Sequence, residues 1–137
     1  MASTMHVEVV SAEQHVYSAD ITELYARGVE GEIGILPGHQ PAVIALDLGA
    51  VTLVLPDGKR ELVAVHRGVL FVGQDGKAIV LADIAELAGE IDVERARMRY
   101  AELENLQRDS DDPAVAESLH KQQVRIDVAA GRSPASA

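Results

Sequence analysis

The sequence predicts an α+β fold that is mainly β: an N-terminal antiparallel β-sandwich of about ten short strands, then a C-terminal two-helix hairpin. Short segments that alternate apolar and polar residues follow one another closely over residues 1–88. Asp-Gly pairs at residues 57–58 and 75–76 signal hairpin turns between such segments. From residue 89 the apolar residues recur at helical steps. We therefore expect a sandwich over residues 1–88, a helical hairpin over 89–131 and a disordered tail over 132–137.

Composition limits the classes of protein to which the chain can belong. Its 137 residues suit one modest domain with an appendage, and the absence of cysteine excludes disulfides and thiolate metal sites. A net charge of −10 argues against direct binding to nucleic acid or anionic lipid. The N-terminus lacks a signal-peptide pattern, and the longest apolar run, residues 41–55, is broken by Asp47 and Gly49. The expectation is a soluble intracellular polypeptide.

The strand assignments follow the alternation along the chain, and each is bounded by turn residues. The expected segments are residues 5–10, 15–17, 20–27, 33–36, 42–46, 50–55, 61–66, 69–73 and 77–82. Such closely spaced short strands are typical of an antiparallel sandwich or barrel.

The segment Gly28–His39 is the most unusual part of the sandwich, because it holds four glycines and a proline. We expect a tight loop, a short strand at Ile33–Leu36 and a second turn at Pro37–Gly38. Its charged residues Glu30, Glu32 and His39 would then stand on a stiff, exposed ridge. Two interpretations remain open at this point: a structural turn only, or a ridge that presents charge to a partner.

Two amphipathic helices are expected after the sandwich. Asp92 is a plausible N-cap for the first, and Asp112-Pro113 supplies a cap and a first-turn proline for the second, which Gly131 ends. The apolar stripes are thin: Val93, Ala96, Tyr100, Leu103 and Leu106 in the first helix, and Ala116, Leu119, Gln123 and Ile126 in the second. The hairpin should therefore depend on the sandwich or on a partner, which makes it a candidate moving part.

Signatures of catalysis are missing from the sequence, so no catalytic residue, metal site or required cofactor is expected. There is no phosphate-binding glycine loop that opens a helix, no nucleophile elbow, and the five histidines are scattered. An anion site is one interpretation of the first helix, because Arg95 and Arg99 lie one turn apart just after Asp92. The alternative is an ordinary capped helix with a solvated charged face.

Taken together, three motifs resemble the epsilon subunit of bacterial F-type rotary ATP synthases. Residues 9–14 resemble that family's opening strand and turn, and residues 80–83 resemble the end of its sandwich. The segment Gly28–His39 is similar to its characteristic motif, Gly-x-Glu-Gly-Glu-x-Gly-Ile-x-Pro-Gly-His. The order of a sandwich followed by two helices is also the family's.

The resemblance implies a non-catalytic rotor subunit at the foot of the central stalk. It would bind the gamma subunit and the membrane c-ring, and so couple ring rotation to the gamma shaft. Carried over by position, Ser11 and His39 would face gamma, Glu32 would face the ring, and Glu30 would belong to the same partner-binding ridge. Its location would be the cytoplasmic side of the cell membrane, as a peripheral part of the complex. The helices could reach the alpha and beta subunits and regulate ATP hydrolysis.

In some members of that family a motif at the start of the first helix belongs to a regulatory ATP site. The resemblance carries this role over to the following residues: Ile91, Asp92, Arg95 and Ala96, with Glu86, Arg99 and Arg125 as further candidates. A further arginine of ATP-binding members falls on Glu102 here, and the second helix has only Lys121 and Arg125 as cations. Two alternatives to a rotor subunit therefore stay open: a stand-alone ATP-sensing module, and a small enzyme that uses Glu30, Glu32 and His39.

Overall fold

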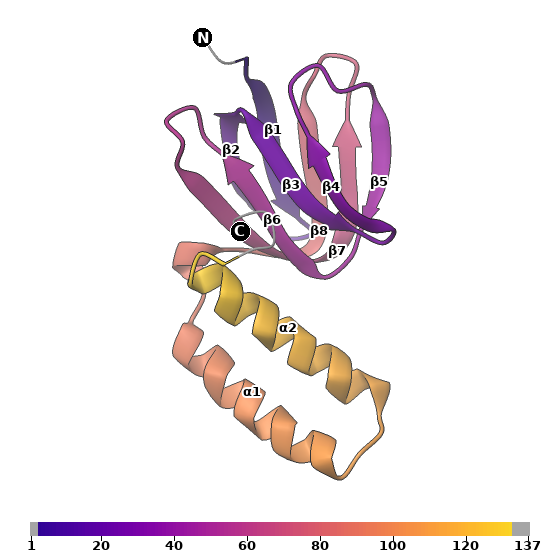
Figure 1. Ribbon diagram of the computed structural model, residues 1–137, viewed down its shortest axis with the longest axis vertical. Helices are drawn as coiled ribbons and strands as arrows, with labels where there is room; N and C mark the ends of the chain where they lie inside the picture. Colours follow the sequence, from indigo (N-terminus) through magenta and orange to yellow (C-terminus); the bar gives the residue numbers. More distant parts are fainter. Residues whose placement is uncertain (1–2, 133–137) are drawn as a thin grey trace.

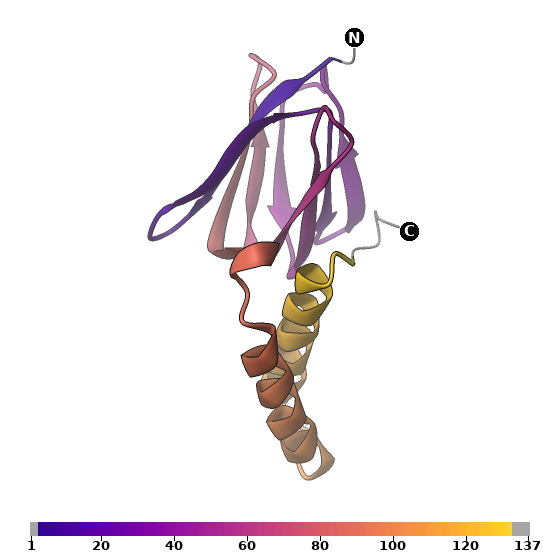
Figure 2. The same ribbon diagram turned by 90° about the vertical axis from the view of Figure 1, so that its left-hand side faces the viewer.

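The computed structural model describes residues 3–132 and shows a β-sandwich with a helical hairpin beneath it (Figure 1). In chain order the elements are β1 (Met5–Ser11), β2 (His15–Ile21), β3 (Glu23–Gly28), β4 (Gly31–Ile35), β5 (Ala42–Leu46), β6 (Gly49–Val54), β7 (Arg60–Val72), β8 (Ala78–Leu87), the short 3₁₀ helix η1 (Ala88–Glu90), α1 (Val93–Arg108) and α2 (Pro113–Ala129). Seen from the side, the two helices project from one end of the sandwich (Figure 2). The predicted sandwich and helical hairpin are confirmed.

Two long strands, β7 and β8, run through both layers of the sandwich. The first half of β7 pairs with β6, and its second half pairs with β5. Strand β8 follows β7 along its whole length, and its first half also pairs with β1. The described chain has eight strands, and about ten were expected; if each half of β7 and of β8 is counted as a strand, the two numbers agree. The sequence predicted an antiparallel sandwich, but strands β1 and β8 pair in parallel.

The bend in these two strands lies at Arg67 and Gly68, where the β7–β8 ladder skips a pair. Arg67 has φ of 62°, a left-handed conformation that is uncommon outside glycine. A Cβ at Gly68 would lie 2.2 Å from the carbonyl oxygen of Leu81, so only glycine fits this close crossing of backbones. Local backbone geometry therefore turns one long hairpin into parts of both layers.

The main core lies between the layers and consists mostly of valine and leucine. Ile21, Leu24, Leu53, Val65 and Leu70 are among its fully buried side chains. The Asp-Gly turns form as predicted: Gly58 and Gly76 have φ of 86° and 80°, each closing a turn between two strands. Local turn chemistry thus sets the register of the strands that build the core.

Both helices begin and end with side-chain or backbone caps. The carboxylate of Asp92 accepts a hydrogen bond from the backbone N–H of Arg95 at 3.1 Å, and Asp112 caps α2 in the same way. At the end of α2, Gly131 has φ of 76° and the N–H of Arg132 donates to the carbonyl of Asp127 at 2.7 Å. Arg132 therefore completes the helix end, whereas the sequence placed it in a disordered tail. The rest of that expected tail, residues 133–137, lies outside the described residues.

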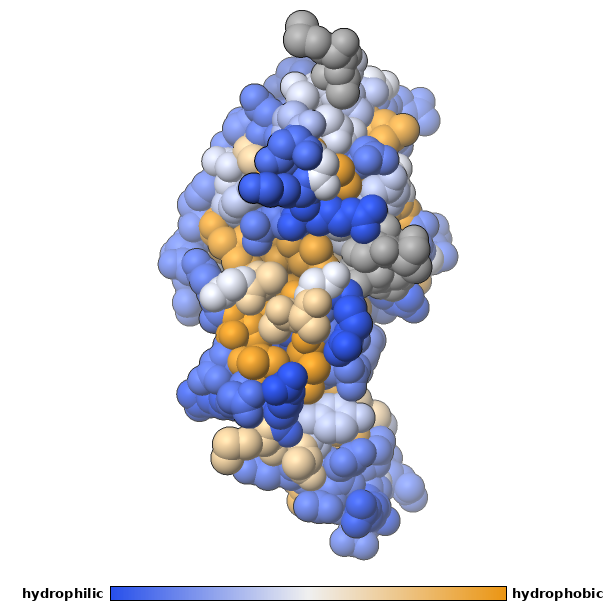
Figure 3. Space-filling model, turned by 60° about the vertical axis from the view of Figure 1, so that its left-hand side comes forward, coloured by the Kyte–Doolittle hydropathy of each residue, from blue (hydrophilic) through white to orange (hydrophobic). Residues whose placement is uncertain are grey.

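Helix α2 carries two buried faces rather than the single thin stripe expected. Val124 and Val128 pack against the sandwich in a second apolar cluster, with Leu48, Leu62, Ala64 and Ile91. Leu119 and Gln122 are also buried, whereas the expected stripe residue Ala116 is exposed. Figure 3 shows apolar side chains gathered at the junction of sandwich and hairpin, framed by polar surface. Within residues 3–132, no helix has the length and apolar character needed to cross a membrane.

Candidate binding surfaces and a charged cleft

The Gly28–His39 segment forms a stiff β-hairpin and a tight turn. Strands β3 and β4 pair from Leu24–Ile35 to Gly28–Gly31, which leaves Glu30 exposed in the connecting turn. Gly31 and Gly38 have φ of 135° and 87°, so both turns need glycine. The expected short strand is thus present, although it begins at Gly31.

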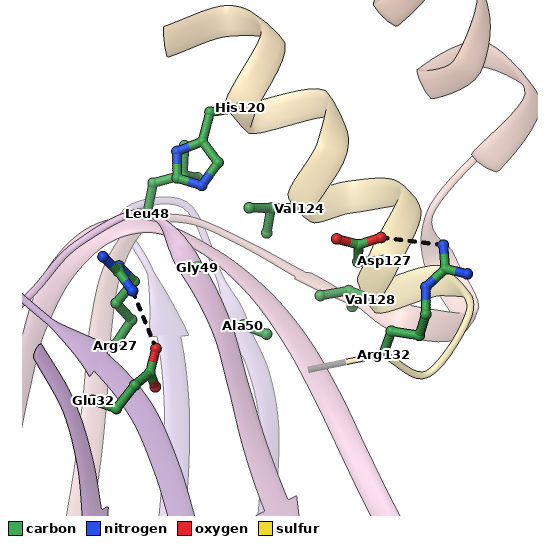
Figure 4. Close-up of a pocket in the computed structure, with 10 residues that line it drawn as sticks. All are labelled: Arg27, Glu32, Leu48, Gly49, Ala50, His120, Val124, Asp127, Val128 and Arg132. Atoms are coloured by element: carbon green, nitrogen blue, oxygen red, sulfur yellow. Dashed lines mark hydrogen bonds and ion pairs between the residues drawn. The ribbon is translucent and has the colours of Figure 1, made fainter. Parts of the chain in front are cut away.

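Glu32 lies beside helix α2 at the base of the sandwich. Its carboxylate pairs with the guanidinium of Arg27 at 3.3 Å, on one side of a pocket of about 310 Å³. On the other side Asp127 of α2 pairs with Arg132 at 3.1 Å, and Val124 and Val128 lie between the two pairs (Figure 4). The end of the ridge and the end of the hairpin are therefore neighbours, which the sequence did not indicate.

Ser11 and His39 both have local structural roles. The hydroxyl of Ser11 accepts a hydrogen bond from the N–H of Gln14 at 3.2 Å and thereby orders the turn after β1. His39 is half-buried, with Nδ1 2.6 Å from the carbonyl oxygen of Gln40, just before β5. The two residues therefore lie at the end of one strand and just before the start of another in the same layer.

Between these strands the layer exposes an apolar surface, which we call the outer face. Cross-strand pairs line up in two rows, which are apolar except for Glu8 at one end: Val43–Phe71–Ile79–Glu8 and Ala45–Val69–Leu81–Val10. Val43, Phe71 and Leu81 are 72%, 39% and 45% exposed, whereas their neighbours along each strand point into the core. Large exposed apolar side chains that adjoin one another are typical of protein–protein interfaces. The alternation of β5, β7 and β8 could have indicated this face from the sequence, because its outward positions are apolar instead of polar.

A charged cleft of about 620 Å³ lies along one side of the contact between α1 and α2. Four of the residues that the resemblance assigns to a nucleotide site line it: Asp92, Arg95, Arg99 and Arg125. Ile91 does not, because it packs in the second apolar cluster. Glu102 also lines the cleft and pairs with Arg99 at 3.0 Å. The cleft is of a size that small ligands occupy, and it contains both signs of charge.

Glu86 is connected to the charged cleft by its ion pair with Arg125, which lines the cleft. The guanidinium of Arg125 donates to both carboxylate oxygens of Glu86, at 2.9 and 3.1 Å, and also to Gln122 at 3.0 Å. A second ion pair, Arg67–Glu117, joins the β7 bend to the N-terminal half of α2. These two pairs and the second apolar cluster hold the hairpin on the sandwich.

His66 is the residue that sequence reasoning missed, since it was only one of five scattered histidines. It is 9% exposed, lies on β7 just before the bend, and its Nε2 is 3.7 Å from the nearer carboxylate oxygen of Glu86. Burial is the main cause that lowers the pKa of His66 to about 4; the charges of Lys121 and Arg125 act in the same direction, and Glu86 opposes them. The imidazole is therefore neutral at physiological pH.

Comparison with known proteins places this architecture in a defined class. The model of the ATP synthase delta/epsilon chain β-sandwich domain matches residues 4–88. The fold therefore defines the class of delta/epsilon subunits of ATP synthases, and the relatives define the subunit more closely.

Several ATP synthase epsilon chains are similar to this chain over most of its length. The epsilon chain of Streptomyces avermitilis is 43% identical over 81% of this chain and 86% of its own. Those of Streptomyces coelicolor and Neisseria meningitidis serogroup A are 39% and 45% identical, over 96% and 87% of this chain and 100% and 85% of their own. The chain belongs to the ATP synthase epsilon chain family. Members of this family are non-catalytic subunits of the ATP synthase complex.

Solved structures support the same fold. A chain in the Euglena gracilis mitochondrial ATP synthase OSCP/F1/c-ring structure is 21% identical, with a TM-score of 0.69 over 91% of this chain and 76% of that one. A chain in the central stalk/c-ring structure of the Tetrahymena thermophila enzyme is 13% identical, with a TM-score of 0.52 over 66% and 71%. At these identities the likeness concerns the fold.

Proposed function

We propose that this chain is a rotor subunit of the central stalk of a proton-translocating F-type ATP synthase and couples rotation of the c-ring to the gamma shaft. The observation that carries the proposal is the outer face, which is apolar, exposed and built on a rigid sandwich. The relatives are named as ATP synthase epsilon chains, and one fold neighbour comes from a central stalk/c-ring structure. Torque transmission needs a stiff body that is held at two separate surfaces. The sandwich offers two such surfaces, the outer face and the turn of the β3–β4 hairpin.

The gamma subunit is the occupant that we assign to the outer face. Ser11 and His39 border the strands of that face, which supports their assignment to the same interface. Burying Val43, Phe71 and Leu81 would remove their exposed area from water, at about 25 cal/mol for each Å². An aromatic residue surrounded by aliphatic side chains is a typical centre of binding energy.

Binding to purified gamma tests this assignment. Phe71→Asp should weaken binding at least about tenfold, because a charge would be desolvated at an apolar contact. Leu106→Asp is the matched control, since Leu106 is an exposed apolar residue at 53% on the far helix. Equal binding by both variants would refute the gamma assignment, provided that circular dichroism shows both to be folded.

We assign the c-ring to the turn end of the β3–β4 hairpin, with Glu30 and Glu32. Both carboxylates are exposed, and the apolar Val29 beside them is 63% exposed. Glu32→Lys should weaken association with the ring more than it changes ATP hydrolysis by the detached catalytic head. A drop in hydrolysis by that head, with ring association unchanged, would contradict the assignment. Held by these two partners, the chain would be a peripheral component on the cytoplasmic side of the cell membrane.

The helical hairpin supplies a second, regulatory candidate function: binding of ATP in the charged cleft, and contact with the alpha and beta subunits. The favourable observation is that Asp92, Arg95, Arg99 and Arg125 converge on one cleft. Arginine side chains there could pair with the phosphates, whereas Glu102 would repel them. Calorimetry of the purified chain with ATP is the test, with Arg95→Ala as the comparison. Heat that disappears in the variant supports an ATP site, and no heat at millimolar ATP removes it.

A further inference from the structure

The imidazole of His66 is enclosed where the hairpin meets the sandwich. Neither ring nitrogen has a hydrogen-bond partner among residues 3–132, and both nitrogens are shielded from solvent. Leu48 from the β5–β6 turn and Ser118 and Lys121 from α2 line the same small pocket. Helix α2 thus covers the histidine, and removing α2 would expose it.

The charges around His66 disfavour its protonation while α2 is in place. Strand β8 contributes Glu86, whose two oxygens already accept from Arg125. Helix α2 contributes the cations Lys121 and Arg125, and both of these charges lower the pKa of the imidazole. At the rim of the pocket Arg67 of β7 pairs with Glu117 of α2, so these two charges offset each other. A protonated His66 would therefore be a buried third cation beside one carboxylate.

We propose that the helical hairpin docks on the sandwich only while His66 is neutral, so that acidification releases the hairpin. The device uses a buried histidine at the contact between a movable element and its support, and it needs neither nucleotide nor partner subunit. It is independent of the assignments of gamma and the c-ring.

The direction of the effect follows from proton linkage. In the docked state the pKa of His66 is about 4, and after release it should return to the ordinary value of 6.5. The docked state then binds fewer protons, so docking is strongest above pH 6.5 and weakens as the pH falls from 6.5 to 4. Between pH 7.5 and 5.5 the docking constant should fall about tenfold.

A distance measurement on the full chain tests the proposal. The chain has no cysteine, so Gln74→Cys and Asn105→Cys would place a pair of fluorophores on the sandwich and on α1. Energy transfer should report a docked population whose docking constant falls about tenfold from pH 7.5 to 5.5. His66→Gln should remove this dependence, whereas His15→Gln, at an exposed position on β2, should keep it. A pH-independent wild type, or an equal pH response in His66→Gln, overturns the proposal.

A second measurement protects the test against a variant that fails to fold. Proton NMR titration of the His66 ring in the unmodified chain measures how far docking lowers the pKa of this ring below 6.5. A value near 4 supports the proposal, and a value near 6.5 overturns it.

Discussion

Gly68→Ala should destabilise the sandwich through a collision between backbones. The added Cβ would lie 2.2 Å from the carbonyl oxygen of Leu81 and 2.7 Å from the Cα of Ala82, inside the 3.4 Å of ordinary contact. Strands β7 and β8 would have to separate by about 1 Å, and no flexible side chain can move aside. The φ of Gly68 lies outside the left-handed region, so the cost comes from space alone. Overpacking of this kind costs about 2–3 kcal/mol.

Urea denaturation followed by far-ultraviolet circular dichroism measures that loss. The midpoint should fall by roughly 1 M, since domains of this size lose about 2 kcal/mol for each molar of urea. Gly89→Ala is the matched control, because a Cβ there meets nothing within 4 Å. The control should stay within about 0.5 kcal/mol of the wild type. If Gly68→Ala proves as stable as Gly89→Ala, the bend does not depend on close backbone approach and the reasoning fails.

Three further substitutions test the helical hairpin and its contact with the sandwich. Asp92→Ala removes the cap on the N–H of Arg95 and should lower the free energy of unfolding by about 1 kcal/mol in thermal denaturation; Asp92→Asn should restore most of it. Val128→Ala should cost about 2 kcal/mol, seen as faster hydrogen exchange in α2, while exposed Val43→Ala should leave that exchange unchanged. Gly131→Ala should cost about 1 kcal/mol in urea denaturation, because its φ is 76°; equal stability would contradict the assigned helix end.

Much of the binding geometry followed from local patterns. The spacing of Arg95 and Arg99 placed both on one face of α1, where the cleft lies. The glycines of Gly28–His39 predicted the turns that hold Glu30 exposed. The position of Arg125 came from the family resemblance, because nothing in its neighbourhood marks it. Its partner Glu86 lies 39 residues away, so only the packed chain joins them.

The sequence by itself determined the elements that depend on neighbouring residues: alternating strands, Asp-Gly turns, and the caps at Asp92, Asp112 and Gly131. These features are set by backbone dihedral preferences and by hydrogen bonds a few residues apart. Only the tertiary structure decided that β7 and β8 serve both layers, that β1 and β8 run parallel, and that α2 seals His66 against the bend. Those features depend on which distant surfaces fit together, and an unpaired histidine in a sequence carries no sign of the helix that will cover it.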